Sequence, residues 1–145
     1  MTSFLLDVNV LVALAWPSHE FHVAVQRWFA RHAAKGWATC PMVQAGFVRV
    51  VSNPAFSPQA VSPKEAIEAL ALSLRHPAHQ FWPDDLALAD GLGSVADRIV
   101  GHRQVTDAYL LALARHHGGK LTTLDRRLAN LSGRGGSDIE EIVGS

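Results

Sequence analysis

Short apolar runs alternate along this chain with longer stretches of helical periodicity. Each run has the length of a buried strand: 4–6, 37–40, 80–82 and 121–124, with 139–143 as an edge strand. Between the runs, apolar residues recur every three or four positions. This spacing predicts helices at about 9–15, 21–34, 47–51, 62–74 and 106–117, and a broken helix at 84–100. The glycine-rich stretch 133–136 is expected to be a flexible loop.

Prolines, glycines and capping residues mark where these helices begin and end. Pro17 ends the first helix, Gly36 the second and Asn53-Pro54 the third. The stretch Ser62-Pro63-Lys64-Glu65 is a strong helix start, because the serine caps the helix and the glutamate three residues on completes a capping box. Thr106 is expected to cap the last long helix.

Strands that alternate with helices predict an α/β fold. We expect residues 1–145 to form one domain, with a mostly parallel central sheet and flanking helices. A chain of 145 residues that is 48% hydrophobic can bury a core without disulfides. The lone Cys40 cannot form an internal disulfide, which excludes a secreted disulfide scaffold.

The first residues of the chain carry no targeting or membrane signal. Residues 1–7 lack the basic start and apolar core of a signal peptide, and the apolar stretch 8–16 is too short to span a bilayer. We therefore expect a cytoplasmic protein with no membrane partner.

Three polar residues follow predicted strands, where open α/β sheets bind their ligands. Asp7 follows the first strand, Gln44 lies just past the second, and Asp125 follows the strand that ends at Leu124. Asp107 lies in the first turn of the helix that leads into that last strand. The residues alone leave open whether this turn reaches the same edge of the sheet.

Clustered carboxylates repel one another, and a divalent cation relieves that repulsion. Magnesium prefers oxygen ligands and can stabilise the charge of a phosphodiester under attack. Each aspartate also has a purely structural interpretation as a helix cap or turn former. His116 and His117 are adjacent, so they lack the i, i+4 spacing of metal ligands on one helix face, and we interpret them as structural.

Four stretches of the sequence resemble the motifs of the PIN-domain ribonucleases, specifically the VapC-type toxins of bacterial toxin–antitoxin operons. They occur in family order along nearly the whole chain: LLDVNVLVAL at 5–14, TCPMVQAGFVRV at 39–50, QVTDAYLLALA at 104–114 and KLTTLD at 120–125. Any one of these motifs would be a weak signal, whereas four in order are specific.

The resemblance implies a compact sheet with flanking helices and an acidic pocket that binds Mg²⁺ or Mn²⁺. It implies that Asp7 and Asp107 are metal ligands, since the third-motif aspartate of this family reaches the same pocket. Asp125 would be a further catalytic acid, acting through water or a second metal. Asn9 and Thr123 would be supporting polar residues. The resemblance also implies endonucleolytic cleavage of RNA, a small cognate antitoxin of the VapB kind, and a homodimer.

One position departs from the family pattern. The second motif usually carries a glutamate, and the matching residue here is Gln44. An amide offers a weak ligand oxygen but no negative charge. The alternative is therefore a degenerate PIN domain that binds RNA or a protein partner without cleaving. A phosphotransferase with Asp7 as nucleophile is disfavoured, because that chemistry needs a second aspartate where this chain has Asn9.

Charge and aromatic content suggest where RNA and partners would bind. The formal net charge is zero, which argues for a local basic rim rather than strong nonspecific binding. We expect Arg126 and Arg127, which follow Asp125, to contact RNA together with Arg103. Aromatic residues are frequent in the N-terminal half, among them Trp16, Phe21, Trp28, Phe29 and Trp37. We expect most of them in the core and the others at a dimer seam or antitoxin groove.

Overall fold

The strands form one parallel sheet in the computed structural model, which describes residues 2–93, 95–133 and 137–143. Its members are β1 (Phe4–Leu6), β2 (Trp37–Thr39), β3 (His79–Phe81), β4 (Lys120–Thr123) and β5 (Ile139–Glu141). The strand order is β3-β2-β1-β4-β5, and every neighbouring pair is parallel. The α/β fold with a parallel central sheet and an edge strand near residue 139 is therefore confirmed.

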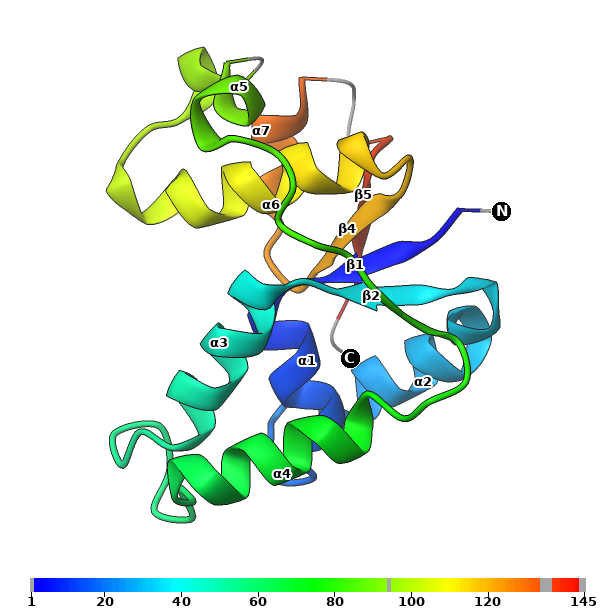
Figure 1. Ribbon diagram of the computed structural model, residues 1–145, viewed down its shortest axis with the longest axis vertical. Coiled ribbons are helices and arrows are strands. Elements are labelled where there is room, and N and C mark those ends of the chain that lie inside the picture. Colours follow the sequence, from blue (N-terminus) through cyan, green and yellow to red (C-terminus); the bar gives the residue numbers. More distant parts are fainter. Residues whose placement is uncertain (1, 94, 134–136, 144–145) are drawn as a thin grey trace.

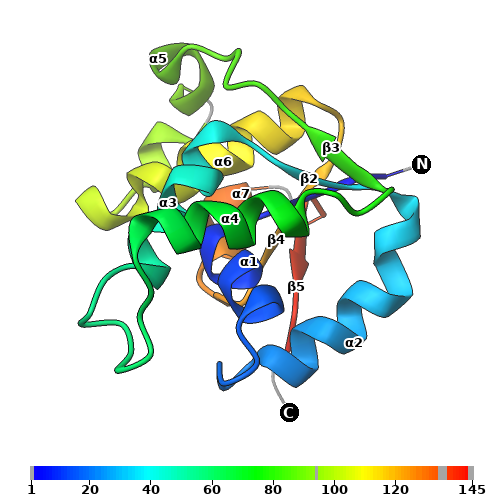
Figure 2. The same cartoon turned by 60° about the horizontal axis from the view of Figure 1, so that its bottom comes forward.

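Helices cover both faces of this sheet. They are α1 (Val8–Ala15), α2 (His22–His32), α3 (Pro41–Val51), α4 (Pro63–Ser73), α5 (Leu88–Leu92), α6 (Val105–His116) and α7 (Leu128–Ser132), with 3-10 turns η1 (Ala33–Lys35), η2 (Ala96–Arg98) and η3 (His102–Gln104). Figure 1 shows α1 to α4 on one side of the strands and α5 to α7 on the other. Figure 2, in which the bottom of Figure 1 comes forward, shows α4 and α1 in front of the sheet.

The apolar runs became strands because both faces of the sheet are covered. Strands β1 and β2 are buried at every position, as expected for parallel strands between two helical layers. The edge strand β3 is more open, and Phe81 is largely exposed. Trp28 and Trp37 belong to the core, and Trp16, Phe21 and Phe29 pack partly buried against it.

The helix boundaries confirm some predictions and correct others. The capping box at α4 is present, with Glu65 N–H donating to Ser62 Oγ and Ser62 N–H donating to Glu65 Oε1. Helix α3 begins at Pro41, earlier than its apolar residues indicate. The prediction for Thr106 was wrong, because the preceding 3-10 turn lets α6 begin at Val105 with Gln104 as its N-cap.

The structure differs from the prediction at residues 84–100, and it describes only part of the predicted loop 133–136. Within the described part of residues 84–100, helix is confined to α5 and η2; α5 runs through Gly91 and ends at its C-cap Gly93. Gly133 has φ +65° and ends α7. The rest of the predicted loop, 134–136, lies outside the described residues.

The strand order places a topological switch beside β1. The chain passes from β1 to β2 and β3 on one side and then returns to β4 on the other. At such a point the connections leave the carboxyl ends in opposite directions and open a crevice. Among the described residues, no helix has the length and apolar character needed to cross a membrane.

Candidate active site

Asp7 lies at the carboxyl end of β1 and caps the helix that follows. Its Oδ1 accepts the Val10 N–H at 3.0 Å, so the structural role of a helix cap is real. The side chain is nonetheless buried, with 6% of its surface exposed. Burial raises the pKa of Asp7 to about 6; the Thr123 hydroxyl and the Val10 N–H oppose this rise, and the charge of Asp107 adds to it.

Thr123 is the last residue of β4 and connects two of the predicted site residues. Its hydroxyl donates to the Asp7 carboxyl. Its Oγ1 accepts the backbone N–H of Asp125 at 3.0 Å. A single buried hydroxyl therefore holds the ends of β1 and β4 together across the switch point.

Asp107 reaches this edge of the sheet from the first turn of α6. Desolvation raises its pKa, the charge of Asp125 raises it further, and Arg127 lowers it. Asp107 in turn raises the pKa of Asp7. The structure thus brings Asp7, Asp107 and Asp125 into one electrostatic cluster and answers the question that the sequence left open about the third motif.

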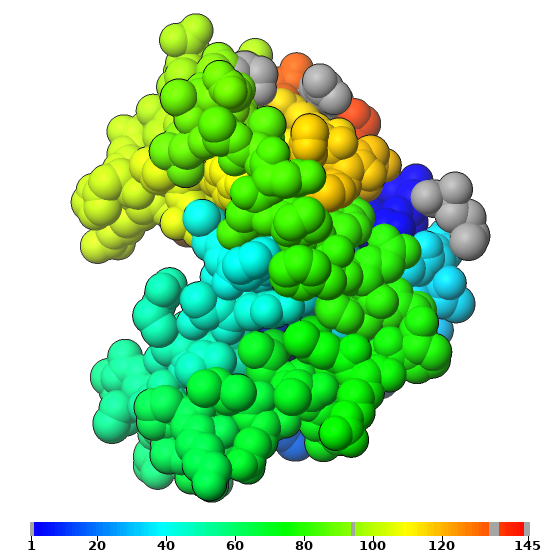
Figure 3. Space-filling model, viewed as in Figure 1, coloured from blue at the N-terminus to red at the C-terminus, as the bar shows by residue number. Residues whose placement is uncertain are grey.

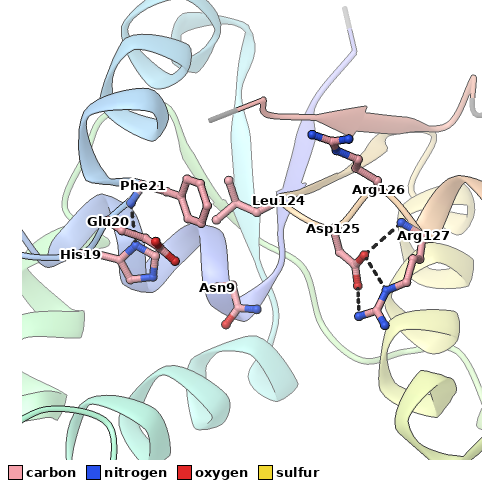
Figure 4. A pocket seen from close by; sticks show the side chains of 8 residues that line it. All are labelled: Asn9, His19, Glu20, Phe21, Leu124, Asp125, Arg126 and Arg127. Atoms are coloured by element: carbon pink, nitrogen blue, oxygen red, sulfur yellow. Dashed lines mark hydrogen bonds and ion pairs between the residues drawn. The ribbon is translucent and has the colours of Figure 1, made fainter. Parts of the chain in front are cut away.

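Asp125 is held differently from the other two acids. Arg127 forms a bidentate pair with it, Nε to Oδ1 and Nη2 to Oδ2 both at 3.1 Å, and the Arg127 backbone N–H adds a contact at 2.9 Å (Figure 4). The Arg127 guanidinium and N–H keep the pKa of Asp125 below its usual value. Asp125 therefore stays ionised, and its charge is partly balanced within the chain.

Two neighbouring recesses share Asp125 and Arg127. The wider one, drawn in Figure 4, is lined by Asn9, His19, Glu20, Phe21, Leu124, Asp125, Arg126 and Arg127. The other is lined by Arg103, Gln104, Asp107, Asp125, Arg127 and Leu128. All three arginines of the predicted basic rim thus line a recess beside an acid. His19 and Glu20, which follow α1, were not predicted as site residues, and Phe21 was expected only in the core or at a partner surface.

Gln44 lies in the first turn of α3, but its amide is directed to the end of β2. Its Nε2 donates to Thr39 Oγ1 at 3.0 Å, and Thr39 Oγ1 lies 2.8 Å from His79 Nε2. Among the described residues, Gln44 is not one of the groups that shift the pKa of Asp7, Asp107 or Asp125. The amide therefore has a structural partner of its own.

Comparison with known proteins shows the family. Residues 4–134 match the model of the PIN domain. The chain is 46% identical over 131 residues to Ribonuclease VapC39 of Mycobacterium tuberculosis H37Rv, covering 90% of this chain and 94% of that protein. It is 47% identical over 128 residues to Ribonuclease VapC38 of the same strain, covering 88% and 89%. The chain therefore belongs to the PIN-domain family. Within that family it is of the VapC type.

Solved structures share the fold at low sequence identity. A VapBC2 structure from Rickettsia felis, bound to a DNA fragment from the promoter, matches with a TM-score of 0.65 at 14% identity over 97% of this chain and 98% of that one. The FitAcB structure from Neisseria gonorrhoeae matches with a TM-score of 0.60 at 17% identity over 95% and 96%.

Proposed function

We propose that this protein is a divalent-metal-dependent endoribonuclease and the toxin of a type II toxin–antitoxin pair, built as one PIN domain over residues 1–145. The observation that carries the proposal is the cluster of Asp7, Asp107 and Asp125 at the switch point of the sheet. Burial raises the pKa of two of these acids, Asp7 and Asp107, and perturbed carboxylates of this kind are typical of functional sites. The ribonuclease names of relatives that match nearly the full chain support the same reaction class.

The donors present fit Mg²⁺ or Mn²⁺. The described partners of the buried Asp7 carboxyl are a hydroxyl and backbone N–H groups, so no full positive charge balances it. Oxygen ligands from one or two carboxylates, with water completing the shell, are what Mg²⁺ prefers. Asp7 and Asp107 would hold the ion, and Asp125 would act through water or toward a second ion. When bound, the ion would stabilise charge on the phosphodiester and supply an activated water.

The remaining residues position the acids and the RNA. Thr123 contacts the Asp7 carboxyl and the Asp125 N–H, and Asn9 lines the recess between Asp125 and the α1–α2 connection. Arg103, Arg126 and Arg127 would contact phosphates along the recesses. Arg127 is engaged by Asp125 in the ion-free protein, so a cation near Asp125 would release the guanidinium for RNA.

A second candidate function rests on Gln44. With an amide at the position where the family usually has a glutamate, a PIN domain that binds RNA or a protein without cleaving is the alternative. The Gln44–Thr39 hydrogen bond supports it, because that amide is committed to the end of β2.

The proposed binding partners are inferred from the proteins that this chain resembles. The matched structure is described as VapBC2 bound to a DNA fragment from the promoter, and the relatives are named VapC ribonucleases. On this similarity we propose a small VapB-like antitoxin for this chain, and a homodimer in the cytoplasm. Aromatic residues half-buried at the surface, Trp16, Phe21 and Phe29, are candidates for those contacts.

The test is cleavage of a defined RNA panel by the purified protein. We expect cleavage with Mg²⁺ or Mn²⁺, none in EDTA, and a collapse of turnover in Asp7→Asn and Asp107→Asn with melting still cooperative. RNA binding without cleavage in every metal would favour the degenerate PIN domain. Full cleavage in EDTA would rule the mechanism out.

A further inference from the structure

We propose that Asp85, His116 and His117 form a second metal site, for zinc-class divalent ions, where the segment after β3 meets the C-terminal end of α6. Asp85 lies in the segment between β3 and α5, and the two histidines end α6. Asp85 Oδ1 lies 3.5 Å from His116 Nε2 and 3.3 Å from His117 Nε2. One ligand atom from each residue lies within 4.8 Å of the other two.

These separations suit one small ion. Zinc binds histidine nitrogen and carboxylate oxygen at about 2.0–2.2 Å, so two ligands of a tetrahedral ion lie roughly 3.4 Å apart. The two measured distances from Asp85 are close to that value. Three protein ligands would leave a fourth position for water.

The end of α6 is what lets adjacent histidines converge. His116 is the last helical residue, whereas His117 lies outside the helix with φ −91° and ψ 5°, and Gly118 turns the chain away with φ +72°. The two imidazoles are therefore perpendicular, with ring centroids 5.2 Å apart, instead of fanning out around the helix. The interpretation from the sequence, which assumed regular helix spacing, missed this turn.

The histidine ring is held in place before any ion binds. The buried Trp82 stacks on His117 with centroids 4.6 Å apart and planes 15° apart. His117 Nε2 is itself buried and, within the part of the chain that is described, makes no hydrogen bond, although Asp85 Oδ1 lies 3.3 Å away. A buried nitrogen without a hydrogen bond is costly, and a metal ion would satisfy it. Asp85 and His116 are exposed, so an ion can enter.

The ligand chemistry separates this site from the acidic cluster. Two imidazoles and one carboxylate favour Zn²⁺ and its neighbours over Mg²⁺, while an all-oxygen cluster favours Mg²⁺ or Mn²⁺. Asp107 and His116 lie near opposite ends of α6, roughly 14 Å apart along its axis at 1.5 Å per residue. Zinc would link the segment after β3 to the end of the helix that carries Asp107. Figure 3 shows green atoms of that segment lying against the yellow and gold atoms of this part of the chain.

The test is calorimetric titration of the full chain with Zn²⁺ in excess Mg²⁺, which occupies the carboxylates. We expect one Zn²⁺ per chain, at least tenfold weaker binding in His116→Gln and in Asp85→Asn, and loss of the zinc-dependent rise in Tm in both. Both residues are exposed, so melting in EDTA should match the wild type. Asp84→Asn, one position earlier in the same exposed segment, and His102→Gln, an exposed histidine elsewhere, are the controls.

Three results would overturn the site. Equal Zn²⁺ affinity in wild type, His116→Gln and Asp85→Asn would show that the cluster is an ion pair only. An equal loss in the controls would indicate scattered surface binding. A loss in Asp7→Asn alone would place the zinc in the acidic cluster. None of these measurements depends on RNA cleavage, so failure of the proposed nuclease function would be distinguishable.

Discussion

The hydroxyl of Thr123 bridges Asp7 and Asp125. It donates to the buried Asp7 carboxyl while its oxygen accepts the Asp125 N–H at 3.0 Å. The two acids follow neighbouring strands at the switch point, and a side chain of β4 contacts the carboxyl of one and the backbone N–H of the other. This relationship gives Thr123 a positioning role that the sequence could only suggest from its place in the fourth motif.

Replacing Thr123 by valine should therefore weaken the metal site more than the fold. Loss of the donor removes a group that lowers the pKa of Asp7, and loss of the acceptor frees the Asp125 N–H. We expect Mn²⁺ affinity to fall about tenfold and stability to fall by about 1–2 kcal/mol. Calorimetric titration and denaturant melts would measure both.

The neighbouring residue offers a matched control. Thr122 is buried in the same strand, and its hydroxyl makes no hydrogen bond to any described residue. Thr122→Val should leave metal affinity unchanged and keep or raise stability, because it removes an unsatisfied polar atom. Similar losses in both variants would show that Thr123 acts only by packing.

The raised pKa of Asp7 makes the ion-free protein sensitive to pH. In the unfolded chain the pKa is 3.8, and in the folded chain it is about 6. The stabilising contribution of the protonated carboxyl is fully present below pH 4 and is lost as pH rises through 6. In EDTA, Asp7→Asn should lack this fall and be more stable than the wild type at pH 7, by about 2–3 kcal/mol.

Bound metal should reverse this order of stability between the wild type and Asp7→Asn. Mg²⁺ or Mn²⁺ binds only the folded state with ionised Asp7, so it should raise the Tm of the wild type at pH 7 and leave Asp7→Asn nearly unchanged. Asparagine is also a good N-cap, which keeps the start of α1 intact. If the stability of the two proteins in EDTA changed with pH in the same way, the raised pKa could not belong to Asp7.

Local signals predicted most of the fold, and tertiary geometry accounts for what they missed. A short apolar run such as β1 and the capping box at Ser62 are determined by residues close together in the sequence. Both elements could therefore be predicted from the chain. The start of α6 could not, since the turn at residues 102–104 competes with capping by Thr106. Asp107 needed the family resemblance, because its distance from Asp7 depends on how α6 packs over the sheet.

Arg126 and Arg127 should contribute unequally to RNA binding. Arg127 is paired with Asp125 and lowers the pKa of Asp107, whereas Arg126 is 85% exposed and lies 3.9 Å from Glu141. Changing both to glutamine should weaken RNA binding about tenfold and flatten its dependence on salt, by about 0.7 in slope for each lost phosphate contact. Fluorescence anisotropy across a salt series measures both quantities.

The single variants then separate the two roles. Arg126→Gln should change only the binding of RNA. Arg127→Gln should also raise the pKa of Asp125 and so weaken metal binding by the acidic cluster. An unaltered affinity and salt slope in the double variant would place the RNA path elsewhere.

Gln44→Glu tests whether the second-motif position belongs to the metal site. A fourth carboxylate would help to hold a second ion, and two ions can stabilise both the attacking and the leaving oxygen. In EDTA the variant should be less stable by about 1 kcal/mol, because glutamate cannot donate to Thr39 Oγ1 and adds negative charge near the cluster. With Mn²⁺ it should gain more in Tm than the wild type and, if cleavage is metal-limited, cut faster.

Gln44→Met separates the lost hydrogen bond from the added charge. It removes the donor to Thr39 without a carboxylate, so it should show the loss of stability in EDTA but no gain in Mn²⁺ affinity. Equal Mn²⁺ affinity in wild type, Gln44→Glu and Gln44→Met would show that residue 44 lies outside the site. The acidic cluster would then work with the three carboxylates of Asp7, Asp107 and Asp125 alone, whether or not residue 44 is bonded to Thr39.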